Sequence, residues 1–341
     1  MADYEYTIRR FAMPKIKKPK LPALLERKIS KTGQTRGADD DVIFQNRVNR
    51  CNTVLIPFHQ WKNNEDLRNS IDQFERGFIV LIGPQDYFHS DNPKVFLETY
   101  NLILGENALI FYETRYDWNL HNPEDLGWDF ANSRTAPLGG NYVARVPGTT
   151  ASSQDSGKIN RGYATQSPKG AGIRLYEYAS TETIANCRLQ LEAIYWHCHD
   201  AIDVAVDFGM SKEDALLRKE MCLTECAEKG LLDYDKLYSQ RIINKDKVTV
   251  CPFCLKKLSG NGFYNRLEQP EGREVPDLTV TEINLFHINE LKYGEYNHRP
   301  YNLGWGCHHC NVVVKDSGIY PTLHWLQEVI NRNIEQGYSI P

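Results

Sequence analysis

Runs of apolar residues alternate with helical spacing in the first third of the chain. Phe78–Ile82 is wholly apolar and rich in β-branched residues, and it stops at Gly83-Pro84, so it predicts a buried strand. Ala108–Tyr112 predicts a second strand, and residues 93–104 between the two have helical spacing. Residues 42–48 and 53–58 are expected to form short ordered pieces. The pattern therefore indicates a mixed α/β N-terminal region.

Residues 121–172 are rich in Gly, Ser, Asn, Thr and Pro, and we expect loops there. Basic and aromatic side chains are spread through this stretch and just beyond it, a composition suited to contacting phosphates and bases: Arg134, Tyr142, Arg145, Lys158, Arg161, Tyr163, Lys169 and Arg174. The alternative is a long surface loop that binds no partner.

An apolar stripe at three- and four-residue steps runs through residues 180–208 and predicts one long helix. Ser211 followed by Asp214 resembles a capping box, which would open a second helix that ends near residue 229. A metal site built from His197, His199, Cys222 and Cys226 is conceivable, but buried free cysteines in a core are the more common case.

Length and charge refine this picture. A chain of 341 residues exceeds what a single core usually supports, so we expect two structural units. The formal net charge is −4, yet residues 1–36 hold ten Lys or Arg against three acids, enough to contact several phosphates or to form a solvated arm. No apolar run reaches the roughly 18 residues that cross a bilayer, and residues 1–10 lack a signal peptide's apolar stretch. We therefore expect a cytoplasmic protein with no membrane contact.

Four of the nine cysteines form two Cys-x-x-Cys pairs near the C-terminus, Cys251 with Cys254 and Cys307 with Cys310. Four thiolates satisfy one tetrahedral zinc ion, so the spacing predicts a structural Zn²⁺ site. The odd total and the scattered remaining cysteines argue against a disulfide framework. His308 and His309, inside the second pair, are expected to face solvent or DNA.

Three polar residues in fixed order lie within this zinc frame. His287 ends an apolar run and is followed by Ile288, Asn302-Leu303 comes fifteen residues later, and Asn311 follows Cys310 directly. This arrangement resembles the HNH (ββα-metal) nuclease family. The resemblance implies that His287 is the general base, that Asn302 holds this histidine, and that Asn311 binds a catalytic Mg²⁺ (or Mn²⁺). A base that titrates near neutral pH and an amide oxygen for a hard cation also suit phosphodiester hydrolysis by their chemistry.

The sequence departs from that family at Phe286, where Asp, a second metal ligand, often precedes the histidine. Glu282, Asn284 or Asn289 are possible replacements, and the sequence does not rank them. A degenerate HNH fold that only binds DNA is the alternative.

The resemblance covers about residues 247–320 and leaves a large body to read the substrate, which suggests a type II restriction endonuclease. Residues 20–48 are similar to BstXI-type restriction enzymes. We expect an α+β protein in four parts: a basic arm (1–40), a mixed α/β DNA-recognition region (41–178), a helical region (179–245) and an HNH domain with its four-cysteine zinc site (246–341). Glu26-Arg-Lys28 is the only match we considered to the other common nuclease motif, and it has no acidic partner on a strand.

The expected function is site-specific hydrolysis of double-stranded DNA. Homing or modification-dependent HNH endonucleases and an inactive zinc-ribbon DNA-binding protein are the alternatives. Because one HNH unit cuts one strand, we expect a homodimer. Residues 180–229 are the expected contact, unless these helices form the core that joins the two domains.

Overall fold

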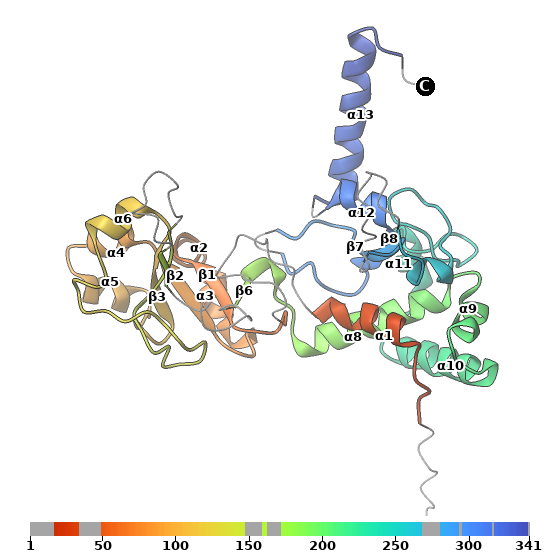
Figure 1. The fold of residues 1–341 in the computed structure, drawn as a ribbon, viewed down its shortest axis with the longest axis horizontal. Helices are drawn as coiled ribbons and strands as arrows, with labels where there is room; N and C mark the ends of the chain where they lie inside the picture. The colour runs from red at the N-terminus through yellow and green to blue at the C-terminus, as the bar shows by residue number, and fades with distance from the viewer. Residues whose placement is uncertain are drawn as a thin grey trace, which may run out of the picture.

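The computed structural model describes residues 17–33, 49–146, 159–161, 172–267, 280–292, 295–315 and 317–339. They form two bodies side by side, one around a sheet and one around helices and a hairpin (Figure 1). One long helix projects away from the second body (Figure 1).

The first body is built on a six-stranded sheet in the order β5-β4-β3-β2-β1-β6. All neighbours pair in parallel except β5, which runs antiparallel to β4. The strands are β1 (Val54–Pro57), β2 (Phe78–Ile82), β3 (Ala108–Tyr112), β4 (Tyr142–Val146), β5 (Ile159–Arg161) and β6 (Ile173–Arg174). Strands buried on both faces read as continuous apolar runs, which is why the sequence shows β2 and β3 so clearly.

Short helices connect these strands: α2 (Phe58–Asn63), α3 (Glu65–Asn69), α4 (Pro84–Phe88), α5 (Pro93–Thr99) and α6 (Arg115–Leu120). Alternate strand residues such as Ile56 and Val80 belong to the larger hydrophobic cluster, with the helices. Leu55 and Ile79 belong to a smaller cluster with Ala131 and Leu138. The sheet is therefore covered on both faces.

The predicted strands at 78–82 and 108–112 are confirmed, and the helix expected within residues 93–104 is present as α5. Loops were expected to dominate residues 121–172, but this stretch also contains β4, which pairs with β3, and β5, which pairs with β4. Tyr142 on this strand is 1% exposed, so its ring packs in the core and does not reach a base. Residues 42–48, Lys158, Tyr163 and Lys169 lie outside the described residues.

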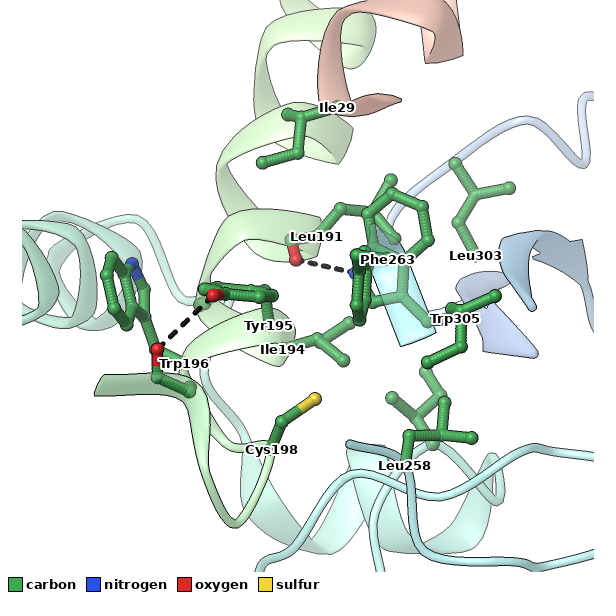
Figure 2. Packing of buried hydrophobic residues seen from close by; sticks show 14 of the residues in the cluster. Ile29, Leu191, Ile194, Tyr195, Trp196, Cys198, Leu258, Phe263, Leu303 and Trp305 are labelled. Atoms are coloured by element: carbon green, nitrogen blue, oxygen red, sulfur yellow. Dashed lines mark hydrogen bonds between the residues drawn. The ribbon is translucent and has the colours of Figure 1, made fainter. Parts of the chain in front are cut away.

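The second body joins elements from both ends of the chain around one core. Its helices are α1 (Ala23–Ser30), α8 (Thr181–Trp196), α9 (Ala201–Asp207), α10 (Lys212–Glu228), α11 (Tyr234–Ser239), α12 (His308–Val314) and α13 (Ile319–Glu335), and its hairpin is β7 (Ile283–His287) with β8 (Leu303–Cys307). Trp305 of β8 packs against α8 and donates its indole N–H to the Leu191 carbonyl at 2.9 Å, with Phe263 and Tyr195 beside it (Figure 2). The helical region and the hairpin thus share a single core.

The single helix expected over residues 180–208 is broken, because α8 ends at Trp196 and α9 begins at Ala201. Thr249 forms hydrogen bonds with the Ile194 and His197 carbonyls at the end of α8. Asp200 accepts from the Gly260 N–H at 2.6 Å and holds the turn. The break is therefore imposed by partners far away in sequence. The second helix is confirmed as α10, with the Ser211 hydroxyl accepting from the Asp214 N–H at 3.0 Å.

Residues 17–33, assigned from the sequence to the basic arm, lie against the second body. Leu25 is fully buried, and Leu21 and Ile29 join the same core as α8. Lys28 donates to the Ile283 carbonyl at 2.6 Å, and Lys18 pairs with Glu225 at 3.2 Å. At least residues 17–33 of the basic segment therefore belong to the folded second body.

The apolar stripe of α8 is also used inside the chain, since ten of its sixteen residues are buried. Cys222 and Cys226 are fully buried on α10, with both sulfurs near the Leu189 carbonyl of α8. α8 and α10 thus pack in a core within the chain. A core at residues 180–229 was the stated alternative to a dimer contact there. Among the helices in the described ranges, none has the length and apolar character that crossing a membrane requires.

Candidate nuclease site and metal centre

Four cysteine sulfurs meet where the hairpin joins α12. The Sγ atoms of Cys251, Cys254, Cys307 and Cys310 all lie within 4.8 Å of one another. Within the described residues they are the only group of three or more His, Cys, Asp or Glu side chains placed to share a metal. The pKa of Cys251 is lowered to about 5, because Cys307 donates its S–H to this sulfur.

This donor set fits a zinc ion. Sulfurs at about 2.3 Å from a tetrahedral metal lie about 3.8 Å apart, and the Cys254 and Cys307 sulfurs are 3.9 Å apart. Cys307 ends β8 and Cys310 lies in α12, so a metal there would tie the 251–254 turn to the start of α12.

The hairpin and α12 form a ββα unit. β7 and β8 pair antiparallel, with Ile283 opposite Cys307 and His287 opposite Leu303. Phe286 is fully buried and its ring lies over Gly306, where a Cβ atom would come within 2.5 Å of the ring. Phe286 is therefore a core residue of the hairpin, and its position does not offer a metal ligand.

His287 ends β7 at the end of the hairpin away from the cysteines. It is half-buried, and its Nε2 lies 3.3 Å from Nδ1 of His298. Burial, followed by the positive charge of Arg50, lowers the pKa of His287 to about 3. The imidazole is thus neutral at physiological pH and has a lone pair, but its pKa lies well below the near-neutral value that the sequence analysis expected of a general base.

Asn302 is buried beside this strand end and acts on backbone, not on the histidine ring. Its Oδ1 accepts from the Asn289 N–H at 2.8 Å, and its Nδ2 donates to the Asn289 and Asn297 carbonyls at 3.3 and 2.7 Å. Among the described residues, Asn302 makes no side-chain hydrogen bond to the ring of His287. Asn302 instead fixes the chain two residues after His287.

Asn311 lies in the first turns of α12, directly after Cys310, and is half-buried. Within the described residues no side-chain hydrogen bond engages its amide, which leaves the Oδ1 atom available to a ligand. His309 is exposed as expected, whereas His308 is half-buried with its Nδ1 3.1 Å from the Asn284 amide.

Three residues could replace the acidic metal ligand that is missing at Phe286, and they lie at different places in the structure. Asn284 already donates to the Thr281 carbonyl at 3.0 Å. Glu282 precedes β7, and its backbone carbonyl accepts from the His308 N–H at 2.7 Å, at the cysteine end of the hairpin. Five residues of strand separate it from His287, about 16 Å. Asn289, exposed and two residues beyond His287, is the only one of the three at the histidine's end.

Sequence reasoning missed His298 and Arg50. His298 is 1% exposed in the β7–β8 connection, and Arg50 is buried and donates to the Thr32 and Glu177 carbonyls at 3.1 and 3.2 Å. A second histidine between His287 and Asn302 was a visible signal for His298. Nothing local in the sequence pointed to Arg50, which precedes β1 and whose positive charge lowers the pKa of both His287 and His298.

The family model described as BstXI restriction endonuclease matches residues 27–309. The chain belongs to the BstXI restriction endonuclease family. The resemblance seen at residues 20–48 is thereby confirmed at the level of the family. The BstXI family match runs from α1 through both bodies to the second cysteine pair, so it includes His287 and Asn302 and stops two residues before Asn311.

Among solved structures, the chain is similar to one described as a type II restriction endonuclease, at 14% sequence identity and a TM-score of 0.29. The alignment covers 46% of this chain and 57% of that one, and so spans little more than half of the neighbour. Likeness at this level carries no argument about mechanism. No curated protein matches this BstXI family member.

Proposed function

We propose that the protein is a type II restriction endonuclease that hydrolyses phosphodiester bonds of double-stranded DNA at a specific sequence. The family match across residues 27–309 carries this proposal. The ββα unit with His287 at its strand end supports the finer assignment to HNH chemistry.

In this mechanism neutral His287 takes a proton from the attacking water, and Asn302 keeps the strand end in place. Asn311 would hold a Mg²⁺ ion, which neutralises the charge that grows on the phosphate and the leaving oxygen. A Zn²⁺ ion on Cys251, Cys254, Cys307 and Cys310 would fix the hairpin to α12 and so set the distance between His287 and Asn311.

A second copy of the chain completes the proposal. One base and one metal cut one strand, and two antiparallel strands are cut most simply by a two-fold pair. We therefore keep the homodimer as part of the proposed function.

The test is incubation of the purified full chain with phage DNA and Mg²⁺. Discrete fragments are expected from the wild type and from His324→Ala, whose ring is exposed on α13. His287→Ala should leave DNA uncut at the same protein concentration while still binding it. Wild-type protein that binds but never cuts would overturn the proposal in favour of a DNA-binding protein, and fragments from His287→Ala would remove the histidine's assigned role.

A further inference from the structure

We propose that two neighbouring turns beside the four-cysteine cluster form a surface that binds the phosphate backbone of duplex DNA. The side chains that make this lysine surface are Lys245, Lys247, Lys256 and Lys257. The proposal deepens the proposed function and rests on it for its biological meaning. The binding of phosphates is nevertheless measured separately from cleavage.

Positive charge is concentrated in this part of the chain. Residues 244–258 hold the four lysines against one acid, Asp246, whereas the whole chain has a formal net charge of −4. All four lysines are exposed. Because every phosphate of DNA carries a negative charge, a group of exposed cations is the electrostatic feature expected where a protein binds nucleic acid.

Two hydrogen-bonded turns hold these lysines close together. In the first turn, Oδ1 of Asn244 accepts from the Asp246 N–H at 3.0 Å. In the second, the Cys251 N–H donates to the Lys256 carbonyl at 2.9 Å. The Nζ atom of Lys257 lies 3.9 Å from Oδ2 of Asp246, so the two turns are neighbours in space as well as in sequence.

The lysine surface rests on a buried base. Thr249 and Val250 lie between the two turns, Leu258 follows the second, and all three are buried. The Thr249 N–H donates to the His197 carbonyl at 3.0 Å, which ties the base to the end of α8. A surface that is ordered before binding loses less conformational entropy when it meets DNA.

Little negative charge offsets the lysines. Across the described part of the chain, no carboxylate lies within salt-bridge distance of Lys245, Lys247 or Lys256. The pair of Lys257 with Asp246 is 59% and 73% exposed, and such pairs contribute little because water screens them. Nζ of Lys247 lies 4.2 Å from the centre of the Tyr234 ring, which orients the ammonium group and leaves its charge in place.

The lysine surface adjoins the proposed nuclease site. Cys254 lies in the same turn as Lys256, and its sulfur is 3.9 Å from the sulfur of Cys307. Cys307 directly precedes α12, the helix that carries Asn311. Phosphates held by the lysines would therefore belong to the same stretch of duplex that reaches the proposed metal ligand.

The salt dependence of DNA binding tests the proposal. A duplex of random sequence is titrated with the full chain in the absence of Mg²⁺, at salt concentrations from about 50 to 200 mM. Each phosphate contact adds about 0.9 to the slope of log affinity against log salt concentration. The double variants Lys245→Gln/Lys247→Gln and Lys256→Gln/Lys257→Gln should each lower this slope by about 1.8 and weaken binding.

Two further variants serve as controls. Lys94→Gln/Lys212→Gln removes the same charge from exposed positions on α5 and α10 and should keep the slope of wild type. Lys256→Arg/Lys257→Arg keeps the charge of the second turn and should also keep the wild-type slope.

An unchanged slope in either glutamine pair would overturn the proposal. Loss of bound zinc from Lys256→Gln/Lys257→Gln with an unchanged slope would overturn it as well, because those lysines would then serve to offset the negative charge of the four thiolates. Failure of the proposed function is a different result. Wild-type protein that binds the duplex through these lysines but never cuts DNA would contradict the nuclease and leave the lysine surface in place.

Discussion

His287 and His298 are both held neutral, since burial and Arg50 depress the pKa of each imidazole, that of His287 to about 3. In the unfolded chain both groups titrate near pH 6.5. Between these values the unfolded state binds more protons, so stability falls as the pH drops below about 6.5. We expect about 1.4 kcal/mol of lost unfolding free energy per histidine at pH 5.5 relative to pH 7.5.

Urea denaturation at the two pH values measures this loss. The cysteine cluster also titrates, so the informative quantity is the difference between wild type and His298→Asn, which lacks one of the two groups. The variant should lose less stability than wild type on acidification. Equal losses would contradict the depressed pKa of His298.

Asn311 offers a different test, because its amide is proposed to hold the catalytic metal. Asn311→Ala should raise the Mg²⁺ concentration for half-maximal cleavage about tenfold, with DNA affinity in the absence of metal unchanged. Asn331→Ala, at an exposed position of α13, is the matched control. Weaker DNA binding without rescue by added Mg²⁺ would assign Asn311 another role.

Among individual site residues, the sequence predicts those whose partners lie at a fixed spacing along the chain. The two Cys-x-x-Cys pairs converge as expected because each pair is one tight turn. The environment of His287 was not predictable in the same way. The charge of Arg50 acts on His287 from more than 230 residues away in the sequence, and no local pattern records such an interaction.

At the scale of elements, the hairpin and α12 depend on the cysteine cluster. Cys254→Ser and Cys307→Ser should each lower the melting temperature and abolish cleavage, because structural zinc contributes on the order of 10 kcal/mol to small domains. Metal analysis should find one zinc per wild-type chain. Cys51→Ser, a buried cysteine outside the cluster, should keep its zinc. A zinc-free wild type, or an unchanged melting temperature in Cys254→Ser, would reject the site.

Strands and helices were predictable where the local pattern of apolar residues indicates burial. β2 and β3 are uninterrupted apolar runs, whereas β4 contains Arg145 and follows the Gly139-Gly140 turn, in a stretch whose composition indicates loops. The break after α8 also escaped prediction, because the helical stripe continues into α9 and only Thr249 and Asp200 show why the chain turns.

For the whole molecule, the proposed homodimer needs an apolar surface that the chain leaves uncovered. α8 does not provide it, since its stripe is buried, but α13 projects from the body (Figure 1) and exposes Leu323, Ile330 and Ile334 on one side. The charged groups of α13 pair along its opposite face, Glu328 with His324 and Arg332. An apolar face without charges can pair with itself about a two-fold axis, so we expect α13 to form the dimer contact.

Ile330→Glu should therefore convert a dimer into a monomer at micromolar concentration, because it places a charge within the paired face. Asn331→Glu adds the same charge on the polar side and should remain dimeric. Light scattering with and without DNA decides between these states. A wild-type chain that is strictly monomeric and only nicks duplex DNA would contradict the homodimer.

The position of α1 affects the order in which the chain can fold during synthesis. Lys28 contacts the Ile283 carbonyl across 255 residues of sequence, so the core of the second body needs a helix synthesised long before the hairpin. At translation rates of about 5–20 residues per second, α1 waits about 13–50 s for its partner. An unfinished chain therefore carries the sheet body without a complete core in the second body. A fragment cut from residue 246 onward lacks α1 and α8, so we expect that it does not fold by itself.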